Sequence, residues 1–198
     1  MLDNNLIDNN QKYSILLDKI NKLTKQKENV IVAIDGGSAS GKTTLCEFLE
    51  QKYDITLIHM DDFFLPPSLR TPQRLNEIGG NIDYDRFLSD ILLPLSNGIE
   101  INYRKFDCST MTLGSSNVLK TKNIVIIEGV YSIHPKFKDF YDLKVFLEVS
   151  PTTQISRIKS RNNEYFANRY INEWIPMENR YFESFCIKEN SDLIITNE

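Results

Sequence analysis

The sequence predicts an α/β protein whose sheet is doubly wound, mostly parallel and five-stranded, with helices on both faces. Five apolar, β-branched runs indicate the strands, and they read VIVAI (30–34), ITLIHM (55–60), NIVIIEG (123–129), LKVFLEV (143–149) and DLIIT (192–196). Continuous apolar runs are typical of strands buried on both faces, which occur in parallel sheets covered by helices. Segments of helical length separate the runs, and this alternation favours the doubly wound arrangement.

Composition limits the classes of partner. The chain has 198 residues, 41% of them hydrophobic, which is enough for one domain with a real core. A formal net charge of -4 without a long basic run argues against nucleic acid as the main partner. No run approaches the roughly 20 apolar residues of a membrane span. We therefore expect neither nucleic acid nor a membrane as partner, and homo-oligomerisation stays open.

The polar start MLDNNLIDNN lacks the basic and apolar parts of a signal peptide. The chain has three cysteines, which are far apart and form no C-x-x-C pair: Cys46, Cys108 and Cys186. Such cysteines argue against a disulfide scaffold or a zinc site, so we expect a reducing, cytoplasmic compartment.

Residues 1–29 are expected to form a helical extension, followed by the main domain over 30–198. Apolar residues recur at helical spacing between positions 11 and 26, which favours a helix packed on the domain edge over a partner-binding helix. The longest irregular segment, 61–122, contains most of the prolines and the pair Gly79-Gly80. Insertions of this length are more often functional than idle, so we expect this one to bind the substrate.

A phosphate-binding motif follows the first predicted strand. The stretch GGSASGKTT matches G-x-x-x-x-G-K-[ST], and the apolar residues after it suit a helix. Glycines let successive backbone N–H groups turn toward an anion, and the helix N-terminus adds its positive end. The expected nucleotide-binding residues are Gly36, Gly37, Ser38, Ala39, Ser40, Gly41, Lys42, Thr43 and Thr44.

The motif predicts a P-loop NTPase that uses ATP and Mg²⁺. Lys42 should reach the β and γ phosphates and act in catalysis, while the Thr43 hydroxyl should bind Mg²⁺. The chain lacks N-K-x-D and D-x-x-G of a GTPase and L-S-G-G-Q of a transporter ATPase, and it is too short for a helicase core. A small-molecule kinase remains, with the choice between ATP and GTP open.

Acidic residues end two of the predicted strands. Asp61 and Asp62 follow ITLIHM, and adjacent residues there should point opposite ways, so we favour Asp61 as catalytic base, acceptor contact and metal neighbour. Glu128 ends NIVIIEG and should lie near the metal, directly or through water. The plain alternative is that these carboxylates are solvated or cap turns. His59 is expected to be a core residue and not a base.

Arginines in SRIKSRNNEYFANR indicate a mobile lid over residues 157–172. Arg157 and Arg161 are four residues apart, so they share a helix face and could stabilise the charge of phosphoryl transfer. Arg169 is expected to approach the substrate from the same segment. The alternative is a solvated helix with surface charges.

The ordered motifs GGSASGKTT, HMDDFF, GGNIDYDRF, VIIEGVY and TTQISRIKSRN together resemble the uridine kinase family of P-loop kinases, which stands beside phosphoribulokinase and bacterial pantothenate kinase. The resemblance covers roughly residues 30–196. It implies that Asp61 is the general base and that Asp83 binds ribose hydroxyls. It also places Glu128 on the acid of the family's F-E-G motif and Arg157 and Arg161 on the lid arginines.

Departures from the family pattern fall on the acceptor side. Phe106 stands where the family has a base-reading tyrosine, and Met111 stands where it has a histidine. Ile158 replaces a second lid arginine, and the stretch after Asn81 lacks the family's proline. We expect a kinase acting on a hydroxyl of a small metabolite, with a nucleoside first. The alternatives are a pantothenate-like or sugar-phosphate acceptor, or a nucleotide-binding sensor without catalysis.

Overall fold

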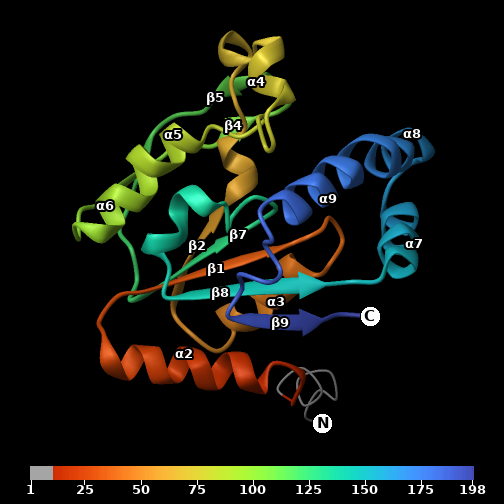
Figure 1. Ribbon diagram of the computed structural model, residues 1–198. Helices are drawn as coiled ribbons and strands as arrows, with labels where there is room; N and C mark the ends of the chain where they lie inside the picture. Colours follow the sequence, from red (N-terminus) through yellow and green to blue (C-terminus); the bar gives the residue numbers. More distant parts are fainter. Residues whose placement is uncertain (1–10) are drawn as a thin grey trace.

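A five-stranded sheet lies at the centre of the protein, whose computed structural model describes residues 11–198 (Figure 1). The strand order is β2-β7-β1-β8-β9, and every pairing between these strands is parallel. The strands are β1 (Val30–Gly36), β2 (Ile55–His59), β7 (Ile124–Glu128), β8 (Leu143–Glu148) and β9 (Leu193–Thr196). The expected doubly wound α/β fold is confirmed, with each strand close to its predicted place.

The central strands are buried on both faces. Every residue of β1 and β7 is buried, whereas β2 at one edge of the sheet alternates between buried and partly exposed residues. Continuous apolar runs therefore mark the middle of the sheet, because helices cover both of its sides.

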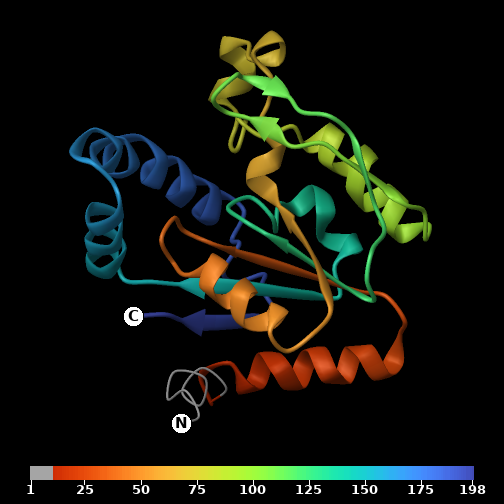
Figure 2. The same ribbon diagram turned by 180° about the vertical axis from the view of Figure 1, so that it is seen from behind.

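Two helices cover one face of the sheet: α2 (Ser14–Gln26) and α3 (Lys42–Glu50). Figure 2 shows α3 in front of the strands and α2 along the edge of the molecule. Leu16 and Ile20 of α2 are fully buried in the core on this face. The predicted extension 1–29 thus contains a packed helix, and its first ten residues lie outside the described part of the chain.

The insertion 61–122 rises from the end of β2 and packs partly on the other face. Its helical segments are η1 (Met60–Phe63), η2 (Pro67–Leu69), α4 (Pro72–Asn76), α5 (Tyr84–Phe87), η3 (Leu88–Leu92) and α6 (Leu93–Ser96). Its short antiparallel strand pairs are β3 (Ile101–Tyr103) with β6 (Asn117–Leu119), and β4 (Phe106–Asp107) with β5 (Thr112–Leu113). The hairpins were not predicted, because strands of two or three residues carry no periodic signal.

The C-terminal third supplies the remaining helical segments: η4 (Pro135–Phe140), α7 (Pro151–Arg161), α8 (Glu164–Arg169), η5 (Tyr170–Trp174) and α9 (Ile175–Ser184). The predicted lid, 157–172, runs from the end of α7 through α8 into η5. Its flanks are α7 and α9, and α9 also packs on the sheet through the fully buried Tyr181. No helix within residues 11–198 is long and apolar enough to cross a membrane.

Candidate active site

The phosphate-binding loop connects β1 to α3 in a conformation that needs its glycines. Gly36 and Gly41 have φ angles of 143° and 99°, where side chains are strained. A Cβ atom on Gly36 would lie 2.3 Å from the Leu147 carbonyl oxygen, and one on Gly41 would lie 2.0 Å from Asn197 Nδ2. The loop therefore passes too close to its neighbours for any side chain at these two positions.

Lys42 begins α3 and reaches back across the loop. Its ammonium group donates hydrogen bonds to the carbonyl oxygens of Gly36 at 2.7 Å and Gly37 at 3.0 Å. Thr43 and Thr44 lie exposed in the first turn of the same helix. A buried lysine, a curled main chain and a helix N-terminus fit a polyphosphate, because all three favour negative charge.

The ends of β2 and β7 bring His59 and Glu128 together. These residues are partners in the register of the two strands, and His59 Nδ1 lies 2.7 Å from Glu128 Oε1. This hydrogen bond raises the pKa of His59, while burial opposes the rise. The His59 side chain is 35% exposed, so the expectation of a core histidine is wrong. A strand end places it at the surface of the site instead.

Asp61 and Asp62 occupy η1, directly after β2, and have different surroundings. Asp62 Oδ2 accepts a hydrogen bond from the Tyr103 hydroxyl and lies 3.4 Å from Lys105 Nζ, both in the insertion. Asp61 has no hydrogen-bond partner among the described residues. Partial removal from water raises the pKa of Asp61, and the nearby Lys42 lowers it. The Asp61 carboxylate therefore has no described hydrogen bond, and it lies within electrostatic reach of Lys42 in the phosphate-binding loop.

No group of three or more histidine, cysteine, aspartate or glutamate side chains in residues 11–198 could hold a metal alone. Mg²⁺ keeps water and substrate phosphates among its ligands and takes only one or two protein groups. The charges of Lys42 and Glu128 both act on Asp61, and the exposed Thr43 follows Lys42 directly, so these side chains are compatible with that pattern of binding.

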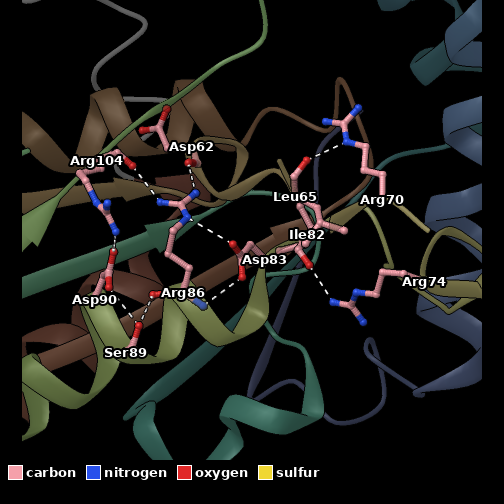
Figure 3. A network of polar contacts seen from close by, with 10 residues as sticks. All are labelled: Asp62, Leu65, Arg70, Arg74, Ile82, Asp83, Arg86, Ser89, Asp90 and Arg104. Carbon is pink, nitrogen blue, oxygen red and sulfur yellow. Dashed lines mark hydrogen bonds and ion pairs between the residues drawn. The ribbon is translucent and has the colours of Figure 1, made fainter. Parts of the chain in front are cut away.

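Asp83 lies beside η1 on the insertion (Figure 3). Its main-chain N–H donates to the Phe63 carbonyl at 2.7 Å. Its carboxylate caps α5 by accepting from the Arg86 N–H at 3.1 Å, and it pairs with Arg86 Nε at 3.6 Å. The sequence suggested a substrate contact only, whereas the structure also makes Asp83 a helix cap and an ion-pair partner.

Phe106 and Met111 lie on the hairpin formed by β4 and β5. Phe106 is 5% exposed, with the Phe64 ring 6.5 Å and the Arg70 guanidinium 5.8 Å from its ring centroid. Met111 adopts a left-handed φ of 58° in the hairpin turn. An apolar, packed ring thus stands where a tyrosine hydroxyl would read a base.

The three lid arginines have separate environments. Arg157 donates to the carbonyl oxygens of Ala39 at 3.3 Å and Asn197 at 2.9 Å, so it ties α7 to the phosphate-binding loop. Burial raises the pKa of the Tyr170 hydroxyl. The charge of Arg161 lowers this pKa and the charge of Asp61 raises it, so both side chains lie within electrostatic reach of Tyr170.

Arg169 pairs with Glu173 at 3.0 Å and stacks over Trp174 at 4.9 Å, both on its own helical run. Its described contacts therefore do not bring it to the loop.

Comparison with known proteins gives a consistent result. The uridine kinase of Staphylococcus haemolyticus is 26% identical over 182 residues, which cover 83% of this chain and 86% of that protein. The uridine kinase of Clostridium perfringens is 25% identical over 186 residues, covering 85% and 88%. This chain is similar to the uridine kinases. No protein-family model matches it.

The fold agrees with that relationship. The structure of a possible uridine kinase from Bacillus stearothermophilus superposes with a TM-score of 0.63, covering 91% of this chain and 98% of that one at 22% identity. "Uridine kinase-like protein 5" of Arabidopsis thaliana is 29% identical over 142 residues, which are 66% of this chain and 30% of that protein. The predicted resemblance to uridine kinases is confirmed.

Sequence reasoning missed the residues that hold the phosphate-binding loop in place. Gln154 of α7 donates to the Ser38 carbonyl at 2.9 Å. Glu178 of α9 accepts from the Ser38 N–H at 2.9 Å and from the Ser38 hydroxyl. The helices that flank the predicted lid are thus both hydrogen-bonded to Ser38, and no local sequence motif predicts these bonds.

Asp35 is a second missed residue, and it lies immediately before the loop. Its buried carboxylate accepts from the N–H groups of Gly36 at 2.7 Å and Ile133 at 3.0 Å and from the Tyr181 hydroxyl at 2.9 Å. Burial raises its pKa to about 6, although these hydrogen bonds and Lys42 oppose the rise. The sequence signal that could have identified Asp35 is an acidic residue at the end of a buried apolar run.

Proposed function

We propose that this protein is an ATP-dependent kinase that transfers the γ-phosphoryl group to a hydroxyl of a small metabolite, with a nucleoside as first acceptor. The observation that carries the proposal is the placement of Asp61. This carboxylate has no described hydrogen-bond partner and lies within the electrostatic reach of Lys42 at the edge of the phosphate-binding loop. The similarity to uridine kinases over most of the chain supports the same reading.

The proposed mechanism assigns the loop to the nucleotide. Backbone N–H groups of residues 36–44 bind the phosphates, and Lys42 turns from the Gly36 and Gly37 carbonyl oxygens to the β and γ phosphates. Mg²⁺, held by Thr43 with Asp61 or Glu128 nearby, would neutralise charge on the phosphates when bound. Arg157 and Arg161 stabilise the transferring group from the lid side.

The same mechanism assigns Asp61 and residues of the insertion to the acceptor. The acceptor hydroxyl gives its proton to the Asp61 carboxylate while its oxygen attacks the γ phosphorus, and ADP leaves. A raised pKa suits a general base, because it brings proton affinity closer to the operating pH. Asp83 binds acceptor hydroxyls with the lone pairs that α5 and Arg86 leave free, and Phe106 and Arg169 complete the proposed acceptor contacts.

A second acceptor class is favoured by the hairpin. Phe106 and Met111 offer no hydrogen bond to a base edge, which supports a pantothenate-like or sugar-phosphate acceptor as the alternative. A sensor that binds nucleotide without catalysis is the remaining candidate, and the retained Asp61 argues against it.

The test is a metabolite panel with ATP and Mg²⁺, read by mass spectrometry for products heavier by one phosphoryl group. The panel contains ribonucleosides, 2′-deoxyribonucleosides, pantothenate and pentose phosphates, and Lys42→Ala is the matched inactive control. A nucleoside monophosphate formed only by the unaltered enzyme supports the first acceptor class. Tight nucleotide binding without any product would overturn the kinase proposal in favour of the sensor.

A further inference from the structure

Three segments that are distant in the sequence meet at the guanidinium of Arg86 (Figure 3). Nη2 donates to the Asp62 carbonyl at 2.7 Å, and Nη1 donates to the Arg104 carbonyl at 2.9 Å. Nε lies 3.6 Å from Asp83 Oδ2. One side chain therefore joins η1, the start of α5 and the link between β3 and β4.

The Arg86 guanidinium is held in a low-dielectric environment. The residue is 7% exposed, and the guanidinium carbon lies 4.2 Å from the centroid of the Phe63 ring. Burial lowers the pKa of Arg86, and Asp83 opposes this change. Removing a charge from water is costly unless the charge is paired and hydrogen-bonded. The three oxygen partners therefore offset the desolvation cost of the Arg86 guanidinium.

The partners of Arg86 adjoin the residues assigned to the acceptor. Asp62 follows Asp61, Arg104 precedes Phe106 by two positions, and Asp83 is itself a proposed acceptor contact. The pair with Asp83 is loose, since Arg86 Nε has no hydrogen-bond partner within residues 11–198. The Asp83 carboxylate thus keeps lone pairs for a further partner.

We propose that Arg86 is a positioning residue that assembles the acceptor side of the active site from these three segments. The inference rests on the proposed kinase function. Arginine suits the task because its planar fork donates in several fixed directions at once, whereas lysine is a point donor on a flexible stem. None of the contacts that the Arg86 side chain makes within residues 11–198 involves the phosphate-binding loop, so its effect passes through the segments that it joins.

Acceptor kinetics test the proposal, with Arg86→Met, Arg86→Lys and the control Arg104→Met. The control removes the neighbouring guanidinium, which pairs with Asp90 at 3.0 Å, but keeps the main-chain carbonyl that Arg86 binds. Losing hydrogen bonds from a charged group should raise the acceptor KM of Arg86→Met about 10–100-fold, with the ATP KM within about twofold. Arg86→Lys should recover part of the loss, and Arg104→Met should resemble the unaltered enzyme.

An equal rise in both KM values of Arg86→Met would overturn the proposal, because a general loss of structure affects both substrates. An equally large acceptor effect in Arg104→Met would also overturn it.

Hydrogen exchange provides a readout that needs no acceptor. In Arg86→Met, amides of 61–65, 82–88 and 103–107 should lose protection together, while those of 36–44 keep it. If the panel finds no acceptor but this joint loss occurs, the kinase proposal fails and the assembly role of Arg86 stands. Loss confined to 82–88 would show that Arg86 only supports its own helix. Should Arg86→Met not fold, Arg86→Lys is measured in its place, with the same three segments expected to lose protection.

Discussion

The neighbouring carboxylates of Asp61 and Asp62 on η1 have different surroundings, and we propose catalysis for Asp61 and structural support for Asp62. Asp61→Asn removes the proposed base, so kcat should fall by about 10²–10⁴ while the Kd for a fluorescent ATP analogue changes little. Asp62→Asn is the matched control, because Asp62 accepts from the Tyr103 hydroxyl and lies beside Lys105, both in the insertion. That variant should lose stability with a much smaller change in kcat. A larger loss of kcat in Asp62→Asn would show that the wrong aspartate has been assigned.

Asp83 caps α5 and pairs with Arg86, and we propose that it also binds the acceptor. Asp83→Asn should mainly raise the acceptor KM, and more for ribosides than for 2′-deoxyribosides, because a carboxylate accepts from two cis hydroxyls at once. It should also lower the free energy of unfolding by about 1 kcal/mol or more through the lost ion pair with Arg86, while the cap on α5 survives, because asparagine and aspartate cap helices equally well. Acceptor kinetics with both sugars, beside chemical denaturation, check the two effects. Equal KM changes for both sugars would contradict a diol contact and favour the second acceptor class.

The helices that flank the predicted lid are hydrogen-bonded to the phosphate-binding loop, since Gln154 of α7 and Glu178 of α9 both bind Ser38. We expect the lid, 157–172, to gain hydrogen-exchange protection when a non-hydrolysable ATP analogue binds, because closure excludes water from the transferring group. Glu178→Ala should abolish this gain and cost about 1–3 kcal/mol of unfolding free energy.

Glu178→Gln is the conservative control for that experiment. Its amide oxygen can accept from the Ser38 N–H, and its amide nitrogen can donate to the Ser38 hydroxyl. The gain in protection should therefore survive in Glu178→Gln. Equal protection with and without the analogue in the unaltered protein would show that the segment is not a lid.

Overall stability should depend on pH through Asp35, which lies under the loop among groups from β1, α9 and the segment after β7. Its pKa is about 6 in the folded protein and 3.8 as an ordinary carboxyl, so the folded state binds more protons between these values. Stability from this group is therefore complete below about pH 4 and is lost as pH rises through 6. Two pKa units correspond to about 3 kcal/mol.

Asp35→Asn isolates this contribution, because all other titrating groups are shared. The variant should be less stable than the unaltered protein at pH 4, because the amide nitrogen cannot accept a hydrogen bond, whereas the hydroxyl oxygen of the protonated carboxyl group still can. The difference in unfolding free energy should then shrink as pH rises to 7, which chemical denaturation at several pH values can measure. A difference that stays constant over this range would contradict a raised pKa for Asp35.

The amino-acid sequence by itself determined the five strands and the phosphate-binding motif, because each depends on a short stretch, and it singled out Asp61 as the candidate base. A buried strand shows its apolar run, and Gly36 to Thr43 carry their chemistry within eight positions. Only the tertiary structure decided that Arg86 joins Asp62, Asp83 and Arg104, or that Ser38 is bound by Gln154 and Glu178. The tertiary structure also decided the position of His59, whose ring contacts Glu128 outside the core because β2 ends at this residue. These contacts join positions up to 140 residues apart, and such pairings depend on how helices pack on the sheet, which no local periodicity records.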